Sequence, residues 1–196
     1  MDENGIVIDD LKKYDINIAY VTPSHQFPTG IIMGISRRTE LLNWANENPS
    51  RYIVEDDYDS EFKYTGRPIP ALKANDINDK VIYLGSFSKS ISPAIRVSYL
   101  VLPKALLNIY QRELPYFICP VPTLNQKILY RFIKEGHFVK HINKMRTLYK
   151  KKREFLVNTI KTYSSKILNK EIQIQGADAG LHMVIKLNQK INKKVI

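Results

Sequence analysis

The sequence has almost no cysteine, since Cys119 is the only one among 196 residues. A single cysteine excludes an internal disulfide and a cysteine-rich zinc site. Long apolar runs are also missing: no stretch approaches the roughly 18 residues that a membrane-spanning helix requires. The first residues are acidic and polar, unlike a signal peptide. We therefore expect a cytoplasmic protein with no membrane partner.

Acidic residues are scarce in the second half of the chain. Residues 1–100 carry 11 Lys and Arg against 14 Asp and Glu, whereas residues 101–196 carry 19 against 5. A basic surface is one way to bind nucleic acid, but the sequence shows no helix-turn-helix or zinc-finger pattern. Direct nucleic-acid binding and a solvent-exposed, lysine-rich helical face both stay open. His137 and His141 have helical spacing for a metal, but a third ligand is missing, so we expect no metal site.

Strand and helix patterns alternate through the first half of the chain. Apolar strands are expected at residues 17–21, 51–59, 81–90 and 97–103, with an amphipathic helix at residues 31–48. This order is typical of an α/β fold with a mostly parallel sheet.

The character of the sequence changes after Pro103. Helices are expected at residues 104–114 and 123–163, and two strands at residues 172–176 and 181–187. We interpret residues 1–103 as part of a large domain and residues 104–122 as a connecting helix and linker. Residues 123–196 are interpreted as the start of a small, incomplete α+β C-terminal domain.

Three polar clusters follow predicted strands: Thr22–Gly30, Glu55–Asp59 and Ser86–Lys89. In open α/β sheets, ligands bind outside the carboxyl ends of the strands. We therefore expect the three clusters to converge on one site.

Lys89 stands in a serine-rich turn just past a strand, and Arg96 follows seven residues later. In a half-buried turn, desolvation and a neighbouring cation favour the neutral amine, which is the form that attacks a carbonyl to make a Schiff base. The hydroxyls of Ser86 and Ser88 and the Arg96 guanidinium are good phosphate ligands. The segment suits an aldehyde cofactor with a phosphate arm. The alternative is a surface turn with an ordinary exposed lysine.

Strand alternation places Asp56 and Tyr58 on one side and Asp57 and Asp59 on the other. A carboxylate that faces inward needs a positive partner, and a protonated pyridine nitrogen would serve. Tyr58 on the same side is placed to donate a hydrogen bond to a phenolate-type oxygen. The alternative is an acidic strand end that caps the next helix or meets a surface lysine.

Four segments of the chain together carry a family resemblance. They are TPSHQFPTG, EDDYDSEFKY, GSFSKSISPAIRVSYLVLP and HINKMRTLYKKKR. The chain resembles the aminotransferase-like domain of MocR-type transcriptional regulators of the GntR superfamily, and is similar to the GABA-responsive regulator of bacilli. The resemblance covers essentially all 196 residues. It implies part of the fold type I, aspartate aminotransferase scaffold, with residues 1–103 belonging to its large cofactor-binding domain.

The resemblance also implies the cofactor pyridoxal 5′-phosphate (PLP). Lys89 matches the family's Schiff-base lysine, Asp56 the carboxylate that pairs with the pyridinium nitrogen, and Tyr58 the tyrosine at the cofactor's 3-oxygen. The residues that match the phosphate-binding cup are Ser86, Ser88 and Arg96.

Phe27 departs from the aminotransferase pattern, in which an asparagine that binds the cofactor's 3-oxygen stands before Pro-Thr-Gly. MocR-type proteins share this change, so it favours a regulator over an enzyme. Whether His25 or Gln26 substitutes for the asparagine stays open in the sequence.

Two classes of function follow from the resemblance. The first is an effector-sensing domain, in which an amino acid or other amino compound exchanges with Lys89 on PLP. Such a domain would form a homodimer and reach DNA only through a winged-helix domain that this chain lacks. The second is a fragment of a class I/II aminotransferase with transaminase activity. Both need the same lysine chemistry, so the motifs leave catalytic turnover undecided.

Overall fold

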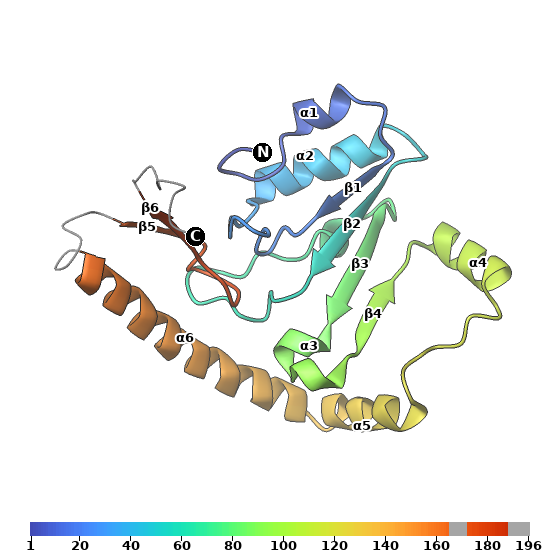
Figure 1. The fold of residues 1–196 in the computed structure, drawn as a ribbon. Coiled ribbons are helices and arrows are strands. Elements are labelled where there is room, and N and C mark those ends of the chain that lie inside the picture. The colour runs from blue at the N-terminus through green and yellow to red at the C-terminus, as the bar shows by residue number, and fades with distance from the viewer. Residues whose placement is uncertain (165–171, 188–196) are drawn as a thin grey trace, which may run out of the picture.

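The computed structural model describes residues 1–164 and 172–187. Its centre is a four-stranded sheet in the order β1 (Ile18–Val21), β2 (Tyr52–Asp57), β3 (Val81–Ser86) and β4 (Ser98–Val101) (Figure 1). The first three strands run parallel, and β4 pairs antiparallel with β3. The predicted α/β fold with a mostly parallel sheet is confirmed.

Two helices cover one face of this sheet, α1 (Ile8–Lys12) and α2 (Ile35–Asn46) (Figure 1). The helix predicted at residues 31–48 corresponds to α2, whereas the sequence did not predict α1. Apolar side chains from these helices and from the strands form the core, among them Leu41, Trp44 and Ile53, each fully buried. Burial of such large apolar side chains supplies the main stabilising free energy of the fold.

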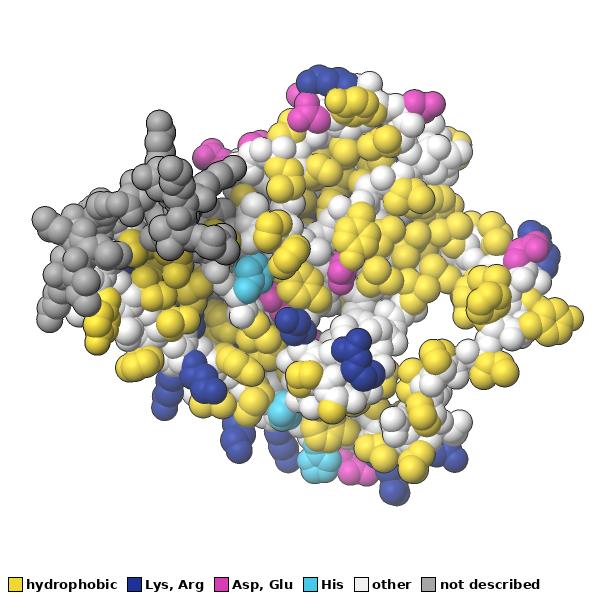
Figure 2. All heavy atoms as spheres, viewed as in Figure 1, with side chains coloured by type: hydrophobic (Ala, Val, Ile, Leu, Met, Phe, Trp, Pro, Cys, Tyr) yellow, Lys and Arg dark blue, Asp and Glu magenta, His cyan; other side chains and the backbone are white. Residues whose placement is uncertain are grey.

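Short elements connect the strands. They are the 3₁₀ helices η1 (Lys73–Asn75) and η2 (Pro93–Ile95), and the single-turn helix α3 (Phe87–Ser90). The other face of the sheet carries exposed apolar side chains, including Ile18 on β1 and Leu100 on β4. Figure 2 shows hydrophobic side chains spread over this region of the molecule.

Three helices follow the sheet: α4 (Lys104–Glu113), α5 (Thr123–Lys134) and α6 (His137–Tyr163). The single helix predicted over residues 123–163 is wrong, because Gly136 adopts φ 77° and separates α5 from α6. Lysines lie exposed along α6 (Figure 2), as a solvated basic face requires. Among residues 1–164 and 172–187, no helix has the length and apolar character to cross a bilayer.

The antiparallel strands β5 (Ile172–Gln175) and β6 (Val184–Leu187) confirm the two strands predicted near the C-terminus. The segment between them docks on the loops of the large sheet. Gly180 N donates to Phe62 O at 2.7 Å, and Tyr64 N donates to Asp178 O at 3.0 Å. Gly180 permits this close approach, since a Cβ there would overlap the His25 ring.

Replacing Gly180 with alanine is expected to destabilise the chain more than the same change at Gly136. Both glycines have positive φ, so alanine costs about 1–2 kcal/mol of backbone strain at either position. At Gly180 alone, the added Cβ would also overlap the His25 ring. This overlap lowers the free energy of unfolding by about 1–3 kcal/mol more. A Cβ at Gly136 meets no heavy atom of the described residues within 4 Å. Urea unfolding measures both losses; equal losses would contradict the tight docking.

Candidate functional site

The carboxyl ends of β1, β2 and β3 open into a pocket of about 420 Å³. Its lining comes from all three strand ends: Tyr20, Val21, Thr22, Gln26, Phe27, Asp56, Tyr58 and Lys89. The three polar clusters of the sequence therefore converge, because neighbouring parallel strands end at the same edge of the sheet.

Asp56 and Tyr58 both line this pocket, whereas Asp57 lies on the opposite face of β2. The Asp57 carboxylate accepts hydrogen bonds from Ser60 Oγ and from Tyr83 Oη, each at 2.7 Å. The alternation predicted for the end of β2 is confirmed.

Lys89 lines the pocket together with Asp56 and Tyr58, but its side chain is exposed. Of the two alternatives that the sequence left open, a half-buried and an exposed lysine, the structure shows the exposed one. The reason is the short helix α3, which turns Ser90 inward, where it is 1% exposed, and leaves Lys89 on the solvent side.

The three residues assigned to a phosphate lie beside Lys89 but outside the lining of the 420 Å³ pocket. Ser86 caps α3, and its Oγ accepts from Ser88 N at 3.2 Å. Phe87 N donates to Val97 O at 3.0 Å, which brings Arg96 next to the same turn. Arg96 is exposed and adopts φ 49°.

Tyr20 is a site residue that the sequence analysis missed. Its hydroxyl donates a hydrogen bond to Asp56 Oδ2. This bond and partial burial raise the pKa of Tyr20 to about 12. The sequence signal was the alternation of β1, which puts Tyr20 on the same side as Thr22.

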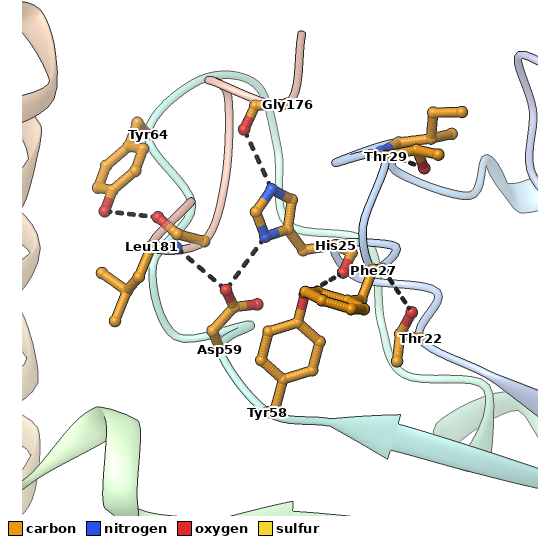
Figure 3. Close-up of polar contacts among 11 residues, drawn as sticks. Thr22, His25, Phe27, Thr29, Tyr58, Asp59, Tyr64, Gly176 and Leu181 are labelled. Carbon is orange, nitrogen blue, oxygen red and sulfur yellow. Dashed lines mark hydrogen bonds and ion pairs between the residues drawn. The ribbon is translucent and has the colours of Figure 1, made fainter. Parts of the chain in front are cut away.

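His25 and Asp59 form a buried pair behind the pocket wall, with side chains 0% and 2% exposed. His25 Nδ1 lies 3.0 Å from Asp59 Oδ2, and His25 Nε2 lies 3.0 Å from Gly176 O (Figure 3). Leu181 N donates to the same Asp59 oxygen at 3.0 Å. The pair thus joins the loop after β1, the loop after β2 and the segment between β5 and β6.

His182 extends this cluster. Its ring centroid lies 4.0 Å from that of His25, 5.8 Å from Phe27 and 6.5 Å from Tyr58. Burial and the neighbouring His25 lower the pKa of His182, which favours its neutral form. Donor atoms of His25, Asp59 and His182 lie within 4.8 Å of one another. Since both His25 nitrogens already face Asp59 and Gly176, we interpret the cluster as a buried polar contact with the His182 ring tilted by 39° against His25.

The loop that departs from the aminotransferase pattern runs along the same pocket. Phe27 is 69% exposed and lines it. Of the two residues left open by the sequence, Gln26 lines the pocket, whereas the His25 ring points to Asp59 and Gly176. The main-chain oxygen of His25, rather than its ring, contacts a residue of the pocket: it accepts a hydrogen bond from Tyr58 Oη at 2.6 Å (Figure 3).

A family model described as aminotransferase class I and II matches residues 7–195. The chain belongs to this family. It is 44% identical over 185 residues to the uncharacterized HTH-type transcriptional regulator YdeL of Bacillus subtilis, covering 94% of this chain and 39% of YdeL. It is 32% identical to the probable rhizopine catabolism regulatory protein MocR of Rhizobium meliloti, covering 100% of this chain and 39% of MocR.

Solved aminotransferases share the fold. The kynurenine aminotransferase of Pyrococcus horikoshii, solved with pyridoxamine phosphate, superposes with a TM-score of 0.83 at 25% identity, covering 97% of this chain and 48% of the enzyme. LysN of Thermus thermophilus, complexed with N-(5′-phosphopyridoxyl)-L-leucine, gives a TM-score of 0.77 at 28% identity, covering 95% of this chain and 48% of LysN. The chain therefore spans about half of these enzymes and 39% of the regulators. The fold type I assignment is confirmed.

Replacing Asp56 with asparagine is expected to lower the pKa of Tyr20 from about 12 towards 10, because the accepting carboxylate is the largest cause of the shift. The matched control is Asp57→Asn, which alters the other face of β2. Titration of the Tyr20 ring signal by NMR measures both variants. An equal change in both would show that Asp56 does not hold the Tyr20 hydroxyl.

Proposed function

We propose that this chain is the PLP-binding, effector-sensing domain of a MocR-type transcriptional regulator. The observation that carries the proposal is the convergence of Asp56, Tyr58 and Lys89 on one pocket. The similarity to several regulators named as HTH-type supports it. DNA binding through a separate HTH domain, a homodimer and a cytoplasmic location belong to the same proposal.

The residues of the pocket suit PLP in chemical type. Asp56 offers a carboxylate to the protonated pyridine nitrogen, and Lys89 offers an amine from another wall of the same pocket. A volume of about 420 Å³ lies within the range usual for small-molecule sites. Ser86, Ser88 and Arg96 gather on the turn beside Lys89, where hydroxyls and a guanidinium suit a phosphate.

PLP, when bound, supplies an aldehyde and an electron-withdrawing ring. Lys89 would hold the aldehyde group through its amine, and an incoming amino compound would compete with Lys89 for that group. Asp56 would hold the protonated ring nitrogen, and Tyr20 orients Asp56 by its hydrogen bond. Exposure of Lys89 leaves room for an incoming amine.

An aminotransferase fragment is the second candidate. The aromatic-amino-acid aminotransferase 1 of Thermococcus litoralis is 29% identical to this chain over 173 residues, with 41% of the enzyme covered. Phe27 argues against this candidate, because a phenyl ring cannot bind a cofactor oxygen as an asparagine does. The regulator therefore remains our conclusion.

Lys89→Ala is expected to abolish the visible absorbance that forms when the chain is mixed with PLP, because Lys89 is the one lysine of residues 1–164 and 172–187 that lines the pocket. Borohydride reduction followed by peptide mass spectrometry should place the pyridoxyl group on Lys89. Lys144→Ala, an exposed change on α6, is the matched control and should keep the absorbance. Labelling spread over surface lysines would contradict the assignment.

A second experiment separates the regulator from the enzyme. In a polypeptide that carries this chain behind its HTH domain, an amino effector should change the PLP spectrum and the binding of a promoter fragment. Release of keto product should stay far below about 1 per second, the low end of common enzyme rates. Sustained turnover at enzyme rates would favour the aminotransferase. Specific promoter binding by the 196 residues alone would favour the basic half as the DNA-binding surface.

A further inference from the structure

Two polar atoms in the cluster of His25, Asp59 and His182 have no hydrogen-bond partner. Asp59 Oδ1 and His182 Nε2 are both buried, and no atom of the described residues hydrogen-bonds either of them. The side chains of His25 and Asp59 are 0% and 2% exposed. A buried polar atom without a partner lowers the stability of a fold. Two such atoms in one cluster therefore indicate that a ligand binds between them.

The main chain determines which nitrogen of His25 faces that ligand. His25 Nε2 lies 3.0 Å from Gly176 O (Figure 3). A carbonyl oxygen only accepts, so Nε2 carries the hydrogen and Nδ1 is the atom that faces Asp59. A histidine that binds a metal almost always donates its second ring N–H to a carbonyl or a carboxylate in this way. Leu181 N supports the carboxylate similarly, because it donates to Asp59 Oδ2 at 3.0 Å.

The separation of the donor atoms suits a small divalent ion. His25 Nδ1 lies 3.0 Å from Asp59 Oδ2, and the donor atoms of all three side chains lie within 4.8 Å of one another. Two ligand atoms that are each about 2.1 Å from a zinc ion lie about 3–3.4 Å apart. One hydrogen lies between His25 Nδ1 and Asp59 Oδ2, whichever atom carries it. A metal ion can take its place when that hydrogen leaves as a proton.

A cavity of about 200 Å³ adjoins the cluster. Gly180, Leu181 and His182 line it on one side, and Tyr64 and Tyr149 are among the residues that line it elsewhere. One water molecule occupies about 30 Å³ in the liquid, so the cavity has room for several. It offers a path by which an ion can enter, a place for a water ligand, and space in which the His182 ring can adjust.

We propose that His25 Nδ1, the Asp59 carboxylate and His182 Nε2 form a binding site for a divalent transition-metal ion. Two imidazoles, one carboxylate and a water ligand suit Zn²⁺, whereas Mg²⁺ and Ca²⁺ prefer oxygen ligands. The ion ties the loops after β1 and β2 to the segment between β5 and β6. This site is separate from the Lys89 pocket, and the proposal holds whether or not that pocket binds PLP.

Calorimetric titration with Zn²⁺ tests the site in the chain without PLP, after treatment with a chelator. We expect one ion per chain, with a Kd of about 1 µM or tighter. Binding should release about one proton per ion, because the ion displaces the hydrogen between His25 and Asp59. Titration in two buffers of different ionisation enthalpy measures this release. At about pH 7.5, exposed histidines are already neutral and release almost none.

His182→Phe keeps a ring of similar size against His25 but removes the ligand nitrogen. It should weaken zinc binding more than about 100-fold, since loss of an outer partner of a metal ligand alone costs about 10–100-fold. Asp59→Asn keeps an oxygen for Leu181 N and should weaken binding in the same direction. Zinc should raise the urea midpoint of the native chain but not that of His182→Phe. Fluorescence of the buried Trp44 confirms that each variant folds.

His137→Ala and Cys119→Ser are the matched controls. Both side chains are exposed and could bind zinc at the surface, so neither change should alter the affinity. Loss of binding in a control, or unchanged binding in folded His182→Phe, would assign the ion to another place and overturn the proposal. Zinc binding without proton release would also contradict it. A native chain that binds no zinc would refute the site and leave water as the partner of the two buried atoms.

Discussion

The buried contact between His25 and Asp59 holds together three segments that lie far apart in the sequence. Burying polar groups is costly unless they find hydrogen-bond partners. Gly176 O lies against the second ring nitrogen of His25 and Leu181 N donates to Asp59 Oδ2, whereas Asp59 Oδ1 is buried without a hydrogen-bond partner among the described residues. Loss of one partner leaves a buried polar group unsatisfied, which costs about 1–3 kcal/mol, so separating the segments lowers the stability of the fold.

The acidic end of β2 shows how one short segment serves both stability and the pocket. Burial raises the pKa of Glu55, whose oxygens accept from the main-chain nitrogens of Leu72 and Lys73 at 2.8 and 2.9 Å. Asp57 is held by two hydroxyls, and Asp59 by His25. Asp56 alone among these four carboxylates lines the Lys89 pocket. Each carboxylate has its own partners, which is why four acids in five residues are tolerated in a largely buried strand end.

The sequence predicted what depends on local pattern and could not predict what depends on distant contacts. Alternation along β2 was enough to place Asp56 on the pocket side, and the order of strands was enough to bring three polar clusters to one edge. The sequence left the exposure of Lys89 undecided because it follows from how α3 packs Ser90. The role of His25 was missed because its partners lie 34 and 151 positions along the chain, and no local periodicity reports such a pair.

In a sensing domain, the bound ligand must change the conformation of the protein, which an enzyme does not require of its substrate. A ligand shifts a conformational equilibrium only if it interacts differently with the two states, so a sensing domain needs a protein group whose contacts depend on what is bound. The Tyr58 hydroxyl meets this requirement: it stands between a pocket that holds Lys89 and a carbonyl tied through His25 to the segment between β5 and β6. Exchange of one amine for another at Lys89 would change what Tyr58 meets in the pocket, and a turn of Tyr58 would break its hydrogen bond to the His25 carbonyl.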